Sequence, residues 1–300
     1  MLVIRDKVKT KDSSHPVVYN IHIADSLQDI ERAEVPEINA QKWEGVCIEH
    51  DWESLTWYGL SGGCKAFQAT MGKGHPEGVE AIRKLSRQMA GKIIRPKVMR
   101  RKRSRGREGD EIDIHSVYSG NLDRAWSQMK RAPRVGKKKV TLLVQVGANS
   151  GTNASDMFWG PAAALALSEE LTKARYAVEI IAVQPADGVF PNLGGRGYVG
   201  LIRIKNFNEP ININSLSIMT LGGFHRYFGF KLRLLSTSKV KDTLGSTRSI
   251  TDRYTQQMVM DNMPAGTTPV FIDRMRRESE AIAEINRVLG TLEEESRKVA

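Results

Sequence analysis

The chain has 300 residues, 40% of them hydrophobic, which is enough apolar material for one large globular domain or two smaller ones. This composition excludes wholesale disorder, and the chain contains no stretch of the roughly 18 apolar residues that a membrane span needs. The formal net charge of +11 favours acidic partners, namely nucleic acid, anionic lipid or an acidic protein. Residues 1–11 lack the apolar core of a signal peptide, so we expect a cytoplasmic protein without a membrane partner.

The N-terminal part of the chain, residues 1–91, predicts a small α+β region. Residues 17–23 favour a short strand. Residues 76–90 predict a helix, because Pro76 suits a first turn and the apolar residues of this stretch share one face. The two cysteines, Cys47 and Cys64, form no CxxC pair and have no histidine cluster beside them. They indicate two reduced thiols in or near a core rather than a disulfide framework or a zinc site.

The densest charge run lies at residues 92–107, where nine of 16 residues are Lys or Arg. An acidic patch follows directly, and Gly106 and Gly109 favour a loop. This pattern predicts that residues 92–113 form a linker or a long exposed loop. Residues 120–129 then favour a short amphipathic helix with Asn121 as its cap.

From residue 140 onward, apolar strands alternate with helical segments. The strand at 140–146, the helix at 161–173 and the strand at 176–183 predict a βαβ unit. Further strands are expected at 199–207, 230–235 and 268–272, with helices at 213–220, 224–228, 252–260 and 273–290. We therefore expect an α/β fold with a doubly wound, mostly parallel sheet over residues 114–300 and an N-terminal α+β extension. The sequence leaves open whether residues 1–139 fold independently or wrap the sheet.

The loop after the 140–146 strand reads Gln145-Val-Gly147-Ala-Asn149 and leads into an Ala-rich helix. Strand, loop and helix together resemble the opening of a von Willebrand A domain, in which the strand ends in Asp-x-Ser-x-Ser and helps to hold a divalent metal. Here Gln145 stands at the Asp position, and Gly147 and Asn149 stand at the hydroxyl positions, so the motif is degenerate. We expect no cofactor, and the sequence leaves open a divalent cation such as Mg²⁺ bound by the remaining polar residues of the loop: Asn149, Ser150, Thr152, Ser155 and Asp156.

Three further stretches, residues 120–126, 204–210 and 224–230, resemble an uncharacterised family of von Willebrand A-like proteins from bacterial viruses and mobile elements. The likeness spans roughly residues 40–235 and implies a viral protein that works in the host cytoplasm. The family implies no settled activity.

Catalytic motifs find little support. The chain has no GxxxxGK[ST] phosphate-binding loop, and residues 59–63 miss the GxSxG pattern by one position. Asp110, Glu111, Asp113 and His115 could supply ligands for a metal-dependent hydrolase, but a solvated acidic loop that balances the nearby arginines explains them better. We therefore expect a binding protein rather than an enzyme.

The sequence favours a protein that contacts RNA or DNA, or organises a nucleoprotein assembly, through the basic run. The alternative is a protein–protein adaptor or a homo-oligomeric structural protein that uses the von Willebrand A-like loop face. The choice between RNA and DNA, the protein partners and the oligomeric state stay open. The expected nucleic-acid-binding residues are the cations of the run: Lys92, Arg95, Lys97, Arg100, Arg101, Lys102, Arg103, Arg105 and Arg107.

Overall fold

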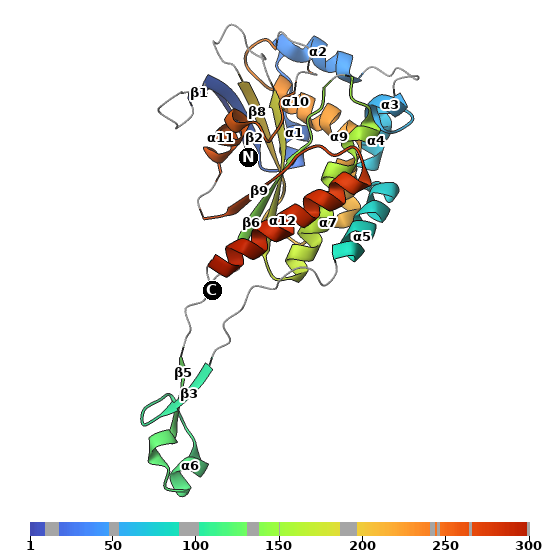
Figure 1. Cartoon of the computed structure of the whole chain (residues 1–300). Helices are drawn as coiled ribbons and strands as arrows, with labels where there is room; N and C mark the ends of the chain where they lie inside the picture. The colour runs from blue at the N-terminus through green and yellow to red at the C-terminus, as the bar shows by residue number, and fades with distance from the viewer. Residues whose placement is uncertain are drawn as a thin grey trace. The chain divides into compact units, whose positions relative to one another are not determined.

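The computed structural model describes residues 1–9, 18–47, 54–89, 102–130, 138–149, 151–186, 197–240, 244, 247–263 and 266–298. The chain divides into two compact units (Figure 1). The first, here called the sheet unit, combines Met1–Ile94 with Lys139–Ala300. The second, here called the inserted unit, is Arg95–Lys138. This division differs from the boundaries at residues 91 and 113 that the sequence suggested, because the N-terminal strands join the same sheet as the C-terminal half of the chain.

The sheet unit is built on a six-stranded sheet in the order β1-β2-β8-β7-β6-β9. The pairs β2–β8, β7–β6 and β6–β9 are parallel, whereas β1–β2 and β7–β8 are antiparallel. The fold is therefore α/β with a mostly parallel sheet, as the sequence predicted. Five of the strands were expected, and the first was not. In sheet order the strands are Leu2–Lys9, Val18–Ala24, Gly197–Lys205, Ala177–Ala186, Lys139–Gln145 and Thr268–Ile272.

Helices pack on both faces of this sheet. On one face, α7 (Trp159–Lys173) is covered in turn by α5 (Pro76–Met89) and α12 (Glu278–Lys298), and Figure 1 shows the three helices side by side. On the other face, α11 (Arg253–Met260) buries Met258 and Val259 against Leu143 and Val199. The predicted helices at 76–90, 161–173 and 252–260 are confirmed. The last helix begins five residues later than expected, because residues 273–277 form an irregular connection after β9.

The remaining helices of the sheet unit are short. Five lie in the N-terminal part or directly after β8, and they surround the buried segment described next. They are α1 (Leu27–Arg32), α2 (Glu37–Cys47), α3 (Ser54–Tyr58), α4 (Gly63–Thr70) and α8 (Ile213–Leu216). No helix of the described residues combines the length and the apolar character needed to cross a bilayer.

Residues 217–234 form a buried run of short helical turns: η4 (Ser217–Thr220), α9 (Gly222–Phe224), η5 (His225–Gly229) and α10 (Phe230–Leu234). The predicted strand at 230–235 is therefore wrong. Alternating apolar and basic residues are typical of a strand with one face in water, but here both cations are buried. Lys231 Nζ donates to the carbonyl of Glu31 at 2.8 Å, and Arg233 Nη1 donates to that of Leu244 at 3.1 Å. These backbone carbonyls accept the hydrogen bonds that water would accept if the two cations lay on the exposed face of a strand.

The inserted unit contains a three-stranded antiparallel sheet in the order β3-β5-β4, with strands Lys102–Gly106, Trp126–Lys130 and Glu111–Ile112. Two short helical turns, α6 (Ile114–Tyr118) and η1 (Leu122–Arg124), join β4 to β5. The expected loop at 92–113 is thus partly strand, and the expected helix at 120–129 is a strand from Trp126 onward. Gly109 lies between β3 and β4, where only glycine fits, since a Cβ there would lie 2.5 Å from the carbonyl oxygen of Ser127.

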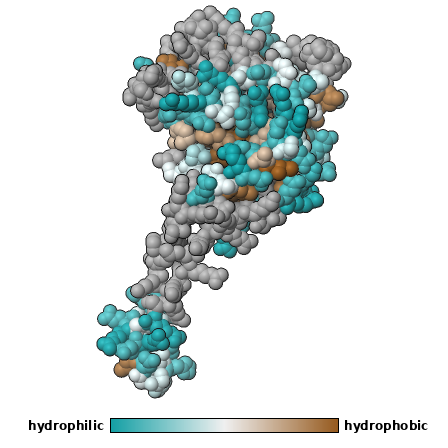
Figure 2. Space-filling model, in the orientation of Figure 1, coloured by the Kyte–Doolittle hydropathy of each residue, from teal (hydrophilic) through white to brown (hydrophobic). Residues whose placement is uncertain are grey.

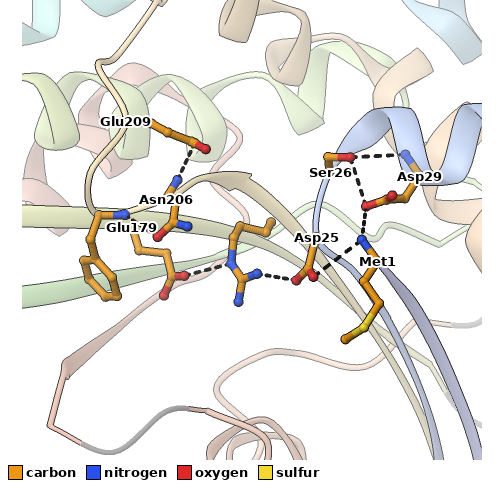
Figure 3. A network of polar contacts seen from close by, with 9 residues as sticks. Met1, Asp25, Ser26, Asp29, Glu179, Asn206 and Glu209 are labelled. Atoms are coloured by element: carbon orange, nitrogen blue, oxygen red, sulfur yellow. Dashed lines mark hydrogen bonds and ion pairs between the residues drawn. The ribbon is translucent and has the colours of Figure 1, made fainter.

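A polar network ties four strands of the larger sheet together at the end remote from the β6 and β9 carboxyl ends. Figure 3 shows the part of it that includes Asp25 and Glu179. Arg203 on β8 bridges Asp25, directly after β2, and Glu179 on β7, with 2.9 Å between its Nε and Glu179 Oε1. Thr141 on β6 donates to the other oxygen of Glu179 at 3.1 Å. Because Glu179 is 2% exposed, these contacts are what keep a buried carboxylate compensated.

Candidate functional site

Loops from three parts of the sheet unit meet at the carboxyl ends of β6 and β9. They are the loop after β6, the segment 247–252 and the residues that follow β9. In open α/β sheets, ligands bind in the crevice beyond the carboxyl ends of the strands, so this edge is the first candidate site.

Gln145, the last residue of β6, holds two of these loops together. Its Nε2 donates to the carbonyls of Gly147 and Arg248 at 3.2 and 3.0 Å, and its Oε1 accepts from the Ile250 amide at 2.7 Å. The side chain is 1% exposed. The residue at the position of the metal-binding aspartate in the resembled motif is therefore committed to backbone groups.

Of the five residues considered for a cation, the structure describes four. Asn149 Oδ1 already accepts from both the amide and the hydroxyl of Thr247, at 3.1 and 2.6 Å. Ser155 is exposed, and Ser150 lies outside the described residues. Among the residues that the structure describes, no three His, Cys, Asp or Glu side chains group as metal ligands would. Asp156 is the only charged member of the five, whereas a hard cation prefers several anionic oxygens.

An open cleft of about 350 Å³ lies at the same edge. Its walls carry both signs of charge and consist of Thr152, Asp156, Asp273, Arg274, Arg276 and Glu280. Asp273 follows β9 directly, and its carboxylate accepts from the hydroxyls of Ser249 and Thr251 at 2.7 and 3.3 Å. Sequence reasoning missed Asp273, although its place as the first polar residue after a predicted strand was a usable signal.

Arg226 fixes one wall of this cleft from inside the protein. Its guanidinium carbon lies 3.8 Å from the centre of the Trp57 ring, Nη1 donates to the Trp57 carbonyl, and Nη2 donates to the carbonyl of Thr152 at 2.7 Å. Burial lowers the pKa of Arg226 to about 10. The side chain thus links α3 to the loop after β6.

A buried polar cluster lies between the sheet and the 217–234 segment. His22 Nδ1 lies 2.8 Å from the carbonyl oxygen of Leu232, and the His22 ring meets Tyr198 edge-on at 5.1 Å between centroids. Burial lowers the pKa of His22 to about 4. His225, whose Nε2 accepts from the Ala148 amide at 3.4 Å, has a pKa lowered in the same way. Within the described part of the chain, the Gln184 amide and the Tyr198 hydroxyl have no hydrogen-bond partner.

The inserted unit carries most of the chain's excess charge. Its 44 residues contain fourteen Lys or Arg and five Asp or Glu, a formal net charge of +9, while the other 256 residues together carry only +2. Charge of one sign on so short a segment produces a strong local field. The second candidate site is therefore this unit.

The nine predicted nucleic-acid-binding residues all fall in or next to the inserted unit. Arg105 Nη2 lies 3.4 Å from Asp113 Oδ2, and Arg107 Nε lies 2.5 Å from Asp123 Oδ1. For Lys102 and Arg103 the structure describes only the backbone, in β3. Lys92, Arg95, Lys97, Arg100 and Arg101 lie outside the described residues.

The acidic residues of the inserted unit serve its local structure. Asp113 caps α6, accepting from the amides of His115 and Ser116 at 3.1 and 3.4 Å. Among the residues that the structure describes, Asp110, Asp113 and His115 do not group as metal ligands would. The geometry gives no support to the hydrolase alternative.

The inserted unit also exposes large apolar side chains. Tyr118 is 87% exposed and Trp126 is 37% exposed. On the face drawn in Figure 2, the described surface of this unit is mainly hydrophilic, with a small brown hydrophobic area. The exposed apolar residues of the unit are Ile112, Ile114, Val117, Tyr118, Leu122 and Trp126.

Residues 7–296 match the family described as a domain of unknown function (DUF7192). The chain belongs to this family. The match runs through both units, so the inserted unit lies within the family's extent. The chain matches no curated protein and no solved structure.

Membership of DUF7192 brings no activity with it, so the choice between the two candidate sites rests on their geometry. In the cleft at the sheet edge, the carboxylates of Asp273 and Glu280 already accept from backbone amides, and Asp273 also accepts from two hydroxyls. The inserted unit combines a charge of +9 with exposed aromatic rings. The inserted unit is therefore the better candidate, because dense positive charge beside exposed aromatic rings indicates an anionic partner.

Proposed function

We propose that this protein binds nucleic acid and that the inserted unit makes the contact. The observation that carries the proposal is the concentration of +9 of the +11 net charge in 44 residues. Cations on one short segment neutralise consecutive phosphates and release condensed counterions, which gives affinity without sequence selection.

The ion pairs within the unit are compatible with this role. Arg105 and Arg107 are 58% and 80% exposed, and exposed ion pairs contribute only about 0–1 kcal/mol. A phosphate can therefore replace Asp113 or Asp123 as partner at little cost. Tyr118 and Trp126 offer ring faces on which unpaired bases can stack, so we favour single-stranded ligands.

The sheet unit, in this proposal, is a von Willebrand A-like platform without the metal of that fold. The contacts of Gln145 support this, because its side-chain amide bonds the backbone of the loops that a metal would otherwise hold in place. Such a platform fits a viral or mobile-element protein that organises a nucleoprotein assembly in the host cytoplasm.

The test is a salt titration of binding to labelled single-stranded RNA, single-stranded DNA and duplex DNA. The variant carries Arg100→Glu, Arg101→Glu and Lys102→Glu. The matched control carries Lys73→Glu, Arg83→Glu and Arg253→Glu, three exposed cations of the sheet unit, and so has the same net charge.

We expect the variant to bind at least tenfold more weakly and to lose about 2–3 from the slope of log K against log salt, because each phosphate contact contributes about 0.7–0.9. The control should keep most of the affinity and the slope. Equal losses in both would contradict the placement in the inserted unit. Absence of binding by the unaltered protein to all three probes at low salt would contradict the function.

A protein-binding adaptor is the second candidate. The exposed aliphatic residues Ile114, Val117 and Leu122 favour it, because aliphatic side chains gain more from a protein surface than from a nucleic acid. Light scattering of the purified protein addresses self-association, and a strict monomer at all concentrations would remove the homo-oligomeric form of this alternative.

A further inference from the structure

The sulfur atoms of Cys47 and Cys64 lie 3.4 Å apart, although 17 positions separate the residues in the chain. Cys47 is the last residue of α2, and Cys64 is the second residue of α4. Both helices pack against the 217–234 segment, which holds their ends in place. Formation of a disulfide requires the two sulfur atoms to approach each other to about 2.05 Å, a movement that side-chain rotation can supply.

The two thiols are not equivalent. Cys64 is 3% exposed, whereas Cys47 is only half-buried. A hydrogen bond from Cys64 lowers the pKa of Cys47, and the nearby ammonium of Lys231 lowers it further. The thiolate is the reactive form of cysteine, so Cys47 combines the better access with the better nucleophile.

We propose that Cys47 and Cys64 are a reversible redox site that forms an intramolecular disulfide on reaction with a small-molecule disulfide such as oxidised glutathione. The Cys47 thiolate attacks one sulfur of the glutathione disulfide and releases one glutathione thiolate. Cys64 then loses its proton and attacks Cys47 Sγ in the mixed disulfide, and the second glutathione thiolate leaves. The two cysteine thiols are oxidised, one glutathione disulfide is reduced, and the two thiol protons end on the two glutathione molecules.

The disulfide closes a loop that includes α3 and therefore Trp57. Trp57 is the residue on which Arg226 stacks, and Arg226 also holds the carbonyl of Thr152 in the wall of the cleft. The oxidation state of the two cysteines is thereby linked, through Trp57 and Arg226, to the loop after β6. This inference is independent of the proposed nucleic-acid binding.

The test exposes the folded full-length protein to buffers with increasing ratios of oxidised to reduced glutathione. Non-reducing peptide mass spectrometry measures the Cys47–Cys64 cross-link. We expect the cross-linked peptide to appear with the loss of two hydrogens, to disappear on reduction, and to raise the Tm by about 5–10 °C, as closure of a loop of this length predicts. A protein that stays fully reduced at a large excess of oxidised glutathione would overturn the proposal.

Two single variants test the order of attack. Cys64→Ser should accumulate a glutathione adduct on Cys47, because the resolving thiol is missing. Cys47→Ser should be modified at least tenfold more slowly, because only the buried Cys64 is left. Circular dichroism confirms that both variants fold, and equal rates of modification in the two would contradict the assignment of Cys47 as the attacking thiol.

Discussion

Arg226 and Trp57 form a buried cation–π pair, with 3.8 Å between the guanidinium carbon and the centre of the indole ring. Arg226 is 1% exposed and bonds the carbonyls of Trp57 and Thr152. Backbone carbonyls and an aromatic face are the groups seen to compensate this buried charge. They also tie together three segments that are distant in sequence.

We expect Arg226→Met to lower the free energy of unfolding by about 2–4 kcal/mol, because two partly buried carbonyls lose their donor while most of the side-chain volume is kept. Urea denaturation followed by circular dichroism measures this. Arg253→Met, at an exposed position of α11, is the matched control and should change stability by less than about 0.5 kcal/mol. Similar losses in both variants would show that the Arg226 contacts contribute little.

Gln145→Glu should also destabilise the sheet unit, by about 2–4 kcal/mol. The substitution turns a donor that serves Gly147 and Arg248 into a carboxylate oxygen that faces their carbonyls. Thermal and urea unfolding check the loss against Gln28→Glu, an exposed position on α1. Added Mg²⁺ should not restore the stability of Gln145→Glu; restoration would indicate that the loop can form a metal site after all.

Stability should fall as the pH is lowered from about 6.5 towards 4. Burial holds the pKa of His22 at about 4 in the folded protein, below its ordinary 6.5, so the unfolded chain takes up the proton first. A shift of one pKa unit corresponds to about 1.4 kcal/mol, which gives about 3 kcal/mol over this window. His225, with a pKa shifted in the same direction, adds to the effect.

Unfolding of His22→Phe between pH 4.5 and 7.5 isolates the contribution of His22. The phenyl ring keeps the edge-on contact with Tyr198 but cannot be protonated. We expect a shallower dependence of stability on pH, with a remainder from His225. An unchanged pH dependence in the variant would exclude His22 as a source.

Tyr118→Ala should weaken binding of single-stranded probes by about 1–3 kcal/mol and leave the salt dependence unchanged, because it removes a stacking surface and no charge. At 87% exposure the tyrosine contributes little to folding, so the loss can be assigned to the ligand. Filter binding or fluorescence anisotropy provides the measurement. Tyr254→Ala, an exposed tyrosine of the sheet unit, is the control, and equal losses in both would argue against stacking on Tyr118.

The sequence predicted those helices and strands whose pattern of apolar and polar residues agrees with their burial in the folded protein. The apolar runs of β6 and β7 and most of the helix α7 between them are buried, and their apolar composition indicates it. α10 was misassigned because Lys231 and Arg233 are buried against the carbonyls of Glu31 and Leu244, and periodicity assumes that cations face water. β5 was read as a helix because its pairing with β3 and β4 is non-local.

The candidate site shows the same limit. The basic run was visible in the sequence because charge density is a local property. The roles of Gln145, Arg226 and Asp273 depend on loops that come together only at the sheet edge, and the contact between Cys47 and Cys64 depends on how α2 and α4 pack. Residues that the fold brings together in this way have no fixed spacing in the sequence, so no sequence motif indicates their contacts.

Lys102, the first residue of β3, is the register partner of Lys130, the last residue of β5. Paired residues on antiparallel strands are about 5 Å apart, so the described inserted unit begins and ends at nearly the same point in space. A unit whose two ends lie this close can be inserted between neighbouring positions of another fold, because closing so short a distance costs little loop-closure entropy. The inserted unit can therefore be replaced, enlarged or duplicated in evolution without displacing a strand of the sheet unit.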